Sequence, residues 1–395
     1  MKKKNGFREL EKFNEARKKF VESIEPLEKE SLLKIVNADD GVLSSSIISP
    51  KSIPSFNKSA MDGYAVKASD TYGASESSPI FLDLKKDVGE EGAERVHTGS
   101  AIPKDSDSVV KIEDVEKDNN RLEVFKALSP GENVDFVGED VEEGEIVFEK
   151  NHHLRPFDIG LLRSLGIEKI NVYKKPKVLV IPTGNEVVSK GEEPRQGEVI
   201  ESNSLVIQLM CEKYGADVDK HEIVEDDPKK ILESLQKVDD YDMIIYSGGT
   251  SVGSRDHTAE VIEETGTVFS HGIGMKPAKP TLLGEYKETP IICLPGHPVA
   301  CSISCFLFAK PSLFKLSNRT FSKSKKESML ERKVESTVGY KTFTRVRLVD
   351  DRAIPIRTSG AGIQTSLTSA DGLVIIPEEK EGLAKGKKVE VVLFD

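Results

Sequence analysis

The chain has 395 residues, of which 37% are hydrophobic and 31% charged, and its formal net charge is −11. A chain of this length is expected to form two or more domains, because single cores stop growing near ~250–300 residues. The acidic balance argues against general nucleic-acid binding, which needs surplus Lys and Arg to displace counterions from phosphates. The apolar runs are short, so no segment is expected to cross a bilayer.

The first predicted element is an amphipathic helix in MKKKNGFRELEKFNEARKKFVESIEP, which lacks the apolar stretch of a signal peptide. From Pro54 to about Phe148, short strands separated by Gly, Pro, Asp and Asn predict a small, mainly β lobe. A helix is then predicted from about Pro156 to Leu165, and Gly166 is placed to end it.

From Lys177 onward, predicted strands and helices alternate. KVLVIP, ADVDKHEIV, YDMIIY and PIICLP are the clearest strands. Ser202 or Asn203 is expected to cap one helix, and Asp227 before Pro228 the next. This alternation predicts a mostly parallel sheet covered on both faces, with ligands beyond the carboxyl ends of its strands. The last ~75 residues return to a β pattern and predict a barrel or sandwich.

The four cysteines do not form a disulfide framework, so a cytoplasmic protein with free thiols is the default expectation. Three of them form a run with a histidine, Cys293-x3-His297-x3-Cys301-x3-Cys305. Zinc would need four donors in a tetrahedron, whereas this run passes from a strand through a turn to a helix. Buried thiols that act as small hydrophobes are the favoured interpretation.

Four polar loops each follow a predicted strand: TGNE, EDDP, SGGTSVG and PGHP. We expect them to meet at one edge of the sheet. SGGTSVG offers several backbone N–H groups, and Gly248 and Gly249 would let the chain approach a phosphate. LPGHPVA is similar to a second anion site at a helix N-terminus. Ordinary turn chemistry is the alternative for both.

Charged residues lie in or near these loops. Lys276 and Lys279 could each pair with a phosphate or oxyanion, or be solvated surface charges. Glu186 and Asp256 follow separate strands, and with an aspartate of EDDP they would form an oxygen cluster suited to Mg²⁺. Whether Asp226 or its neighbour, the helix cap, is that aspartate stays open.

Taken together, the motifs resemble those of the molybdopterin molybdotransferase family, which includes MoeA-type proteins and the gephyrin E domain. The likeness runs from about residue 8 to the C-terminus. Its most specific elements, in family order, are SAMDGYAV, RVHTGSAIPKDSDSVV, GENVDFVGED, PTGNEVV, ESNS, SGGTSVGSRDHT, MKPAKPT and LPGHPVA. One such motif would be weak evidence, whereas eight in order are strong.

The resemblance implies a multidomain fold of α/β and β parts. Residues 1–48 and 149–175 would form an elongated helical and β domain, into which residues 49–148 insert as a β lobe. Residues 176–316 would form a doubly wound, molybdopterin-binding (MogA-like) α/β domain, and residues 317–395 a C-terminal β-barrel. Family members are homodimers, with the active site between the α/β domain of one subunit and the β lobe of the other.

The implied reaction takes adenylylated molybdopterin and molybdate or tungstate. It cleaves the phosphoanhydride with Mg²⁺, inserts the metal at the dithiolene, and releases AMP and molybdenum cofactor. The molybdopterin adenylyltransferase and apo-molybdoenzymes are candidate protein partners, and neither nucleic acid nor a membrane is expected. Rival interpretations are the adenylyltransferase itself, which performs the preceding step, and a dimeric scaffold that retains only binding.

The resemblance also implies residue roles, motif by motif. The implied metal ligands are Glu186, Asp226 and Asp256. The implied catalytic residues are Asp62, Thr98, Asp256, Lys276 and Lys279, the first two of them from the second subunit. The implied substrate-binding residues are Asp140, Asn203, Gly248, Gly249, Thr250, Ser251, Pro295, His297 and Pro298. His297 stands where many relatives have Asn, Asp135 where some bacterial members have Arg, and Gly272 where some relatives have Lys or Arg.

Overall fold

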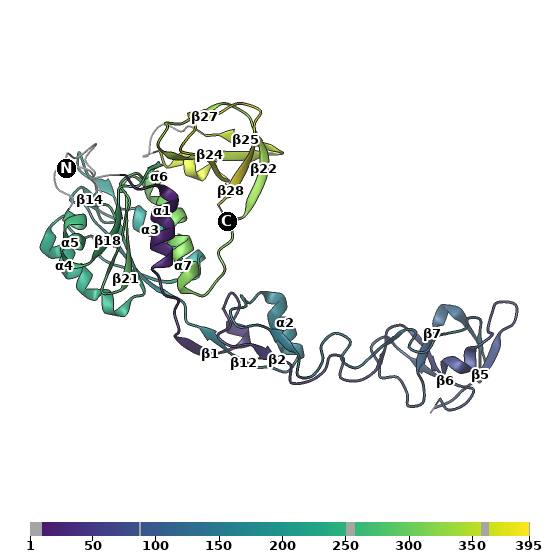
Figure 1. The fold of residues 1–395 in the computed structure, drawn as a ribbon. Coiled ribbons are helices and arrows are strands. Elements are labelled where there is room, and N and C mark those ends of the chain that lie inside the picture. The colour runs from purple at the N-terminus through teal and green to yellow at the C-terminus, as the bar shows by residue number, and fades with distance from the viewer. Residues whose placement is uncertain (1–9, 87, 250–256, 357–362, 395) are drawn as a thin grey trace. The chain divides into compact units, whose positions relative to one another are not determined.

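The structure is a computed structural model that describes residues 10–86, 88–249, 257–356 and 363–394. The chain divides into two compact units: Leu32–Val172 is one, and Met1–Ser31 with Tyr173–Asp395 the other. Figure 1 labels the elements of both.

The larger unit contains a six-stranded sheet with the order β16-β13-β17-β21-β20-β18. The first four strands run parallel to one another, and β20 pairs antiparallel with both of its neighbours, β21 and β18, which confirms the predicted mostly parallel sheet. In chain order the strands are β13 (Lys177–Pro182), β16 (Asp217–Lys220), β17 (Met243–Ser247), β18 (Thr267–His271), β20 (Leu282–Tyr286) and β21 (Thr289–Leu294).

Helices cover both faces of this sheet. Alternate residues of β13 therefore point into two different hydrophobic cores, one on each face. Val178 and Val180 lie in one hydrophobic cluster, and Leu179 and Ile181 lie in another. A strand buried on both faces reads as a continuous apolar run, as KVLVIP does. Figure 1 shows the helices on either side. They are α1 (Phe13–Glu22), α3 (Asn203–Lys213) and residues 298–316 on one face, and α4 (Pro228–Leu235) and α5 (His257–Thr265) on the other.

Helix α1 belongs to the α/β domain, which corrects the prediction that residues 1–48 form one domain. Phe13 and Phe20 are 2% and 0% exposed, and they share a core with sheet residue Val178. The ring of Phe13 also lies 5.0 Å from that of Phe343 in the C-terminal domain. The amphipathic pattern predicted the helix but not its partner, because any apolar surface satisfies an apolar face.

One continuous helix, Pro298–Leu316, follows β21 and comprises α6 (Pro298–Ser304), a π-helical turn (Cys305–Ala309) and α7 (Lys310–Leu316). Its 19 residues and mean hydropathy of 1.4 would suffice to cross a bilayer, and no other helix among the described residues passes that test. However, 83% of its most apolar stretch is buried inside the protein. We interpret it as a core helix, longer than the short apolar runs suggested.

All four cysteines are buried, as predicted. Cys293 lies in the core on one face of the sheet, whereas Cys211, Cys301 and Cys305 lie in the core on the other. The sheet therefore separates the donors of the Cys-His run. Burial raises the pKa of the Cys301 thiol, as expected of a thiol packed as a hydrophobe.

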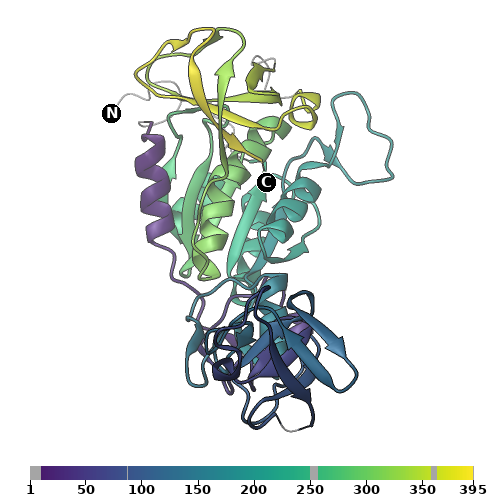
Figure 2. The same cartoon turned by 90° about the vertical axis from the view of Figure 1, so that its right-hand side faces the viewer.

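The C-terminal domain is a closed five-stranded barrel, in the order β24-β25-β22-β28-β26 and back to β24 (yellow in Figure 2). Its strands are β22 (Lys325–Leu330), β24 (Lys341–Val349), β25 (Arg352–Pro355), β26 (Gly372–Ile376) and β28 (Lys388–Leu393). Its core includes Val346, Val374 and Val391. The short strand β19 (Met275–Lys276) pairs with β24 and so links the barrel to the α/β domain.

The smaller unit begins and ends with two neighbouring strands, β1 (Glu30–Lys34) and β12 (Lys169–Tyr173). The N–H of Lys174 donates to the carbonyl of Lys29 at 2.8 Å, and that of Ile35 to Glu168 at 3.0 Å. Strands β2 (Ile47–Ile48) and β11 (Ile146–Phe148) also pair, and α2 (Pro156–Ser164) packs in the same core. The helix predicted from about Pro156 to Leu165 is present as α2.

The inserted β lobe has its own six-stranded sheet, in the order β7-β4-β6-β5-β9-β8, and a core around Tyr64, Leu82 and Leu122. Its strands are β4 (Gly63–Val66), β5 (Ile80–Leu84), β6 (Gly92–Val96), β7 (Ser108–Lys111), β8 (Val115–Asp118) and β9 (Arg121–Val124). A further pair, β3 (Lys58–Ser59) and β10 (Val134–Asp135), lies outside this sheet.

Candidate functional site

The loops after β13, β17 and β21 line one pocket of ≈ 610 Å³, within the size range of ligand pockets. The start of α3 and one barrel residue complete its walls. Three of the four predicted loops thus meet beyond the strand ends. The lining residues are Pro182, Thr183, Glu186, Val187, Val199, Ile200, Glu201, Ser202, Asn203, Ser247, Gly248, Gly249, Pro280, Pro295, Gly296, His297, Pro298 and Gln364.

Gly248 and Gly249 are required by the packing of the loop itself. Their φ angles are +106° and +67°, in the region that favours glycine. A Cβ at Gly248 would lie 2.4 Å from the carbonyl oxygen of Thr183, and one at Gly249 would lie 2.4 Å from Oγ1 of Thr258. The loop is therefore pressed against the end of β13, which leaves its outer surface to the pocket. Thr250 and Ser251 lie outside the described residues.

Hydrogen bonds tie the walls of the pocket together. The side-chain amide of Asn203 donates to the carbonyl of Gly296 at 2.7 Å, which joins the start of α3 to the PGHP turn. The N–H of Gly248 donates to the carbonyl of Leu294 at 3.0 Å. His297 occupies the position just before α6, and Pro298 is the first residue of that helix. The two hydrogen bonds join Asn203 and Gly248, which are predicted substrate-binding residues, to the PGHP turn and to the end of β21.

Glu201 and Gln364 are among the lining residues that the sequence analysis did not assign to the site. The Glu201 carboxylate accepts hydrogen bonds from the N–H of Ser204 at 2.7 Å and from its hydroxyl at 2.6 Å. Glu201 thus caps α3, so the expectation that the side chain of Ser202 or Asn203 does so is wrong. Gln364 reaches the pocket from the C-terminal domain and donates to Oγ of Ser202 at 3.3 Å.

The described carboxylates of the predicted metal cluster lie on neighbouring loops. Glu186 lines the pocket, and a bridge between Thr183 and Val224 sets the next loop beside it. The N–H of Asp226 donates to Oδ1 of Asn185 at 3.1 Å. Carboxylates such as these, together with substrate phosphates, are the ligand type that Mg²⁺ prefers. The third predicted ligand, Asp256, lies outside the described residues.

Asp227, not Asp226, caps helix α4. Its Oδ1 accepts from the N–H groups of Lys229 at 3.0 Å and Lys230 at 3.2 Å. We therefore expect Asp227→Ala to lower the free energy of unfolding by about 1 kcal/mol and to leave Mg²⁺ affinity unchanged. Asp226→Ala should weaken Mg²⁺ binding with little loss of stability.

Urea denaturation and calorimetric Mg²⁺ titration of both variants measure the two effects. If Mg²⁺ affinity were lost in Asp227→Ala but not in Asp226→Ala, Asp227 would be the Mg²⁺ ligand.

The two predicted lysines lie on the segment that leads to Pro280. Nζ of Lys276 donates to Oγ1 of Thr337 at 2.9 Å and lies 4.6 Å from the ring centroid of Tyr340, so it points at the barrel. Lys276 does not line the described part of the pocket. The segment reaches the pocket at Pro280, next to Lys279. Oxyanion binding by either lysine stays a prediction.

In the smaller unit, the two predicted catalytic loops are adjacent. Oδ1 of Asp62 accepts from the N–H of Thr98 at 2.9 Å and lies 3.5 Å from Nδ1 of His97. The hydrogen bond from Thr98, followed by weaker effects of His97, lowers the pKa of Asp62. Asp62 is therefore an exposed, ionised carboxylate at neutral pH. Asp140 is exposed, and its N–H donates to the carbonyl of Ile53 at 3.0 Å.

Two of the residues named above as expected departures from the family pattern, Gly272 and Asp135, have a local structural role. Gly272 has a φ angle of +87°, which favours glycine over a long side chain. Asp135 forms an ion pair with Lys58, between Oδ2 and Nζ at 3.3 Å.

The sheet, its strand-end pocket and the closed barrel define a multidomain protein built around a ligand-binding α/β domain. Three family models match successive parts of the chain. The first is "MoeA N-terminal region (domain I and II)" over residues 11–166. The second is "Probable molybdopterin binding domain" over residues 179–315, and the third "MoeA C-terminal region (domain IV)" over residues 328–394.

Relatives match over nearly the whole length. A Methanocaldococcus jannaschii protein named for molybdopterin biosynthesis is 35% identical over 388 residues, covering 95% of each chain. The molybdopterin molybdenumtransferase of Haemophilus influenzae is 28% identical over 396 residues, covering 97% of this chain and 98% of its own. The crystal structure of a Pyrococcus horikoshii MoeA protein superposes with a TM-score of 0.83 at 34% identity, covering 98% of this chain and all of that one. The chain belongs to the MoeA family.

Proposed function

We propose that this chain is a molybdopterin molybdotransferase. It would take adenylylated molybdopterin and molybdate, cleave the phosphoanhydride with Mg²⁺, and release AMP with the metal-loaded cofactor. The observation that carries the proposal is the strand-end pocket, in which glycine turns and a carboxylate from separate loops meet in one cavity of ≈ 610 Å³. Full-length similarity to proteins named for molybdenum transfer supports it.

The described residues suit the parts of that reaction. Gly248 and Gly249 would bring backbone N–H groups to the phosphates, and the N-terminus of the helix that starts at Pro298 would add its free N–H groups. Glu186 and Asp226 would hold Mg²⁺, which when bound neutralises charge on the phosphoanhydride. Asn203 would position the PGHP turn through Gly296.

The proposal includes a homodimer whose site is shared between subunits. Asp62 and Thr98 lie in a different compact unit from the pocket. In the arrangement expected from the family resemblance, they would face the α/β domain of a second copy. The exposed carboxylate of Asp62 would face the substrate there. The substrate would be bound between the strand-end pocket of one subunit and the loops that carry Asp62 and Thr98 in the other.

The direct test is an assay with purified protein, adenylylated molybdopterin, molybdate and Mg²⁺. We expect AMP release that depends on molybdate, and a product that activates an apo-molybdoenzyme. A parallel reaction with tungstate decides between the two metals. Formation of adenylylated pterin from molybdopterin and ATP, without metal insertion, would instead identify an adenylyltransferase. Pterin binding without either reaction would indicate a scaffold.

A further inference from the structure

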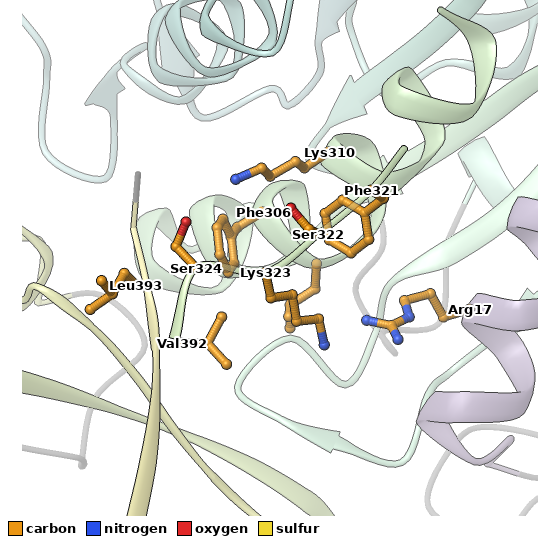
Figure 3. Close-up of a pocket in the computed structure, with 10 residues that line it drawn as sticks. Arg17, Phe306, Lys310, Phe321, Ser322, Lys323, Ser324, Val392 and Leu393 are labelled. Carbon is orange, nitrogen blue, oxygen red and sulfur yellow. The ribbon is translucent and has the colours of Figure 1, made fainter. Parts of the chain in front are cut away.

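A second, much smaller hollow lies within the larger unit, between α1, residues 321–324 and strand β28 of the barrel (Figure 3). Its volume is ≈ 10 Å³, about the room that one water-sized group needs. Arg17, Lys310 and Lys323 line it, and no lining residue carries a carboxylate. Figure 3 shows the guanidinium of Arg17 and the ammonium of Lys323 pointing toward each other.

A third positive side chain, Lys341 of β24, lies beside these two. Cζ of Arg17 and Nζ of Lys341 are 5.2 Å and 5.4 Å from the centroid of the same ring, that of Phe13. Burial, together with repulsion by Arg17, Lys325 and Lys341, lowers the pKa of Lys323 to about 8. The three groups are thus close enough to repel one another in a partly buried place.

Acidic side chains offset only part of this positive charge, because Glu378 and Glu379 favour the charged form of Lys341 but not of Arg17 or Lys323. Among the described residues, no carboxylate lies within 4.0 Å of the side-chain nitrogens of Arg17 or Lys323. Glu390, which favours the charged form of Lys323, is itself paired with Lys325 at 2.8 Å. Like charges held together away from water cost free energy unless an opposite charge accompanies them. Acids outnumber bases in this chain, yet none of the described acidic residues lines this hollow.

We propose that Arg17 and Lys323, with Lys341 nearby, form a binding site for a small inorganic anion at this hollow. The volume fits a halide, or one oxygen of a phosphate-like oxyanion whose remaining atoms face solvent. A bound anion would replace three repulsive contacts with attractive ones. It would also fasten α1 and the linker at residues 321–324 to the barrel. This site is separate from the strand-end pocket, so it does not depend on the proposed reaction.

Thermal unfolding in different sodium salts at one ionic strength tests the proposal. With bulky gluconate replaced by chloride or phosphate, the Tm of the wild type should rise by about 2–4 °C and then saturate. Arg17→Met should lose this rise. Its Tm in gluconate should equal or exceed that of the wild type, because the substitution removes a repelling charge.

Lys18→Met is the matched control, since Lys18 is the next residue on α1 but is exposed and pairs with Glu22 at 3.8 Å. It should keep the full anion response. Lys323→Met, outside any helix or strand, should behave as Arg17→Met does. Equal responses in the wild type, Arg17→Met and Lys323→Met would overturn the proposal.

A crystal of the full chain soaked in bromide, and another grown in phosphate, locate the ligand directly. A peak between Arg17 and Lys323 in either crystal supports the site, and the salt that produces it distinguishes halide from oxyanion. An empty hollow in both crystals would overturn the proposal, even where the variants fail to fold.

Discussion

Glu186→Gln is expected to reduce molybdate-dependent AMP release by roughly 10²–10³-fold without loss of stability. Glu186 is exposed in the pocket, so its carboxylate contributes little to folding. The amide keeps the size of the side chain but removes the charge that Mg²⁺ and the phosphoanhydride would meet. Steady-state AMP release at saturating Mg²⁺, with a melting curve for each protein, measures both effects.

Asp62→Ala should be comparably inactive, and mixing it with Glu186→Gln tests whether the site is shared. In a random mixture, about half of the dimers would contain one subunit of each kind and thus one intact site. Roughly a quarter of wild-type activity should then return. Differently tagged subunits verify that mixed dimers have formed. Verified mixed dimers without activity would refute a site built from both subunits.

Gly248→Ala is expected to lower the free energy of unfolding by about 2–4 kcal/mol and to remove activity. The φ angle of +106° disfavours any side chain, and the new Cβ would lie 2.4 Å from the carbonyl oxygen of Thr183. Relief requires the loop to move away from β13, which would deform the pocket. Urea denaturation and the AMP-release assay report the two losses.

Gly296→Ala is the matched control in the same pocket. A Cβ there would meet only Cα of Gly248, at 3.8 Å, which is ordinary contact. It should fold with nearly wild-type stability. If both variants lost stability equally, close packing against Thr183 would not be the reason for glycine at position 248.

Individual strands and helix ends were predictable from the sequence wherever a short local pattern is typical of one conformation. KVLVIP indicated a strand buried on both faces, and Asp227 before Pro228 indicated the start of α4. Ligands of parallel sheets bind beyond the carboxyl ends of the strands, and this strand-end rule correctly predicted that three of the loops meet at one pocket. Family resemblance added the closed barrel, because short β segments alone did not distinguish it from a sandwich.

Contacts between distant elements were not predictable, because they depend on how separate parts pack. The apolar face of α1 does not indicate which core it enters, so Phe13 and Phe20 were assigned to the wrong domain. Gln364 lies in the barrel and follows no strand of the α/β sheet, so the strand-end rule could not find it. Glu201 lies three residues before Ser204, and no common capping pattern singles it out.

Strands β1 and β12 stand side by side where the smaller unit is inserted, and this matters during synthesis on the ribosome. The nascent α1 emerges long before β13, on whose sheet it packs, and an open chain of that length makes their meeting slow. The inserted unit has hydrophobic cores of its own, so we expect that it can fold before β13 has been synthesised. Once it has formed, its paired ends shorten the effective gap between α1 and the sheet to a few residues.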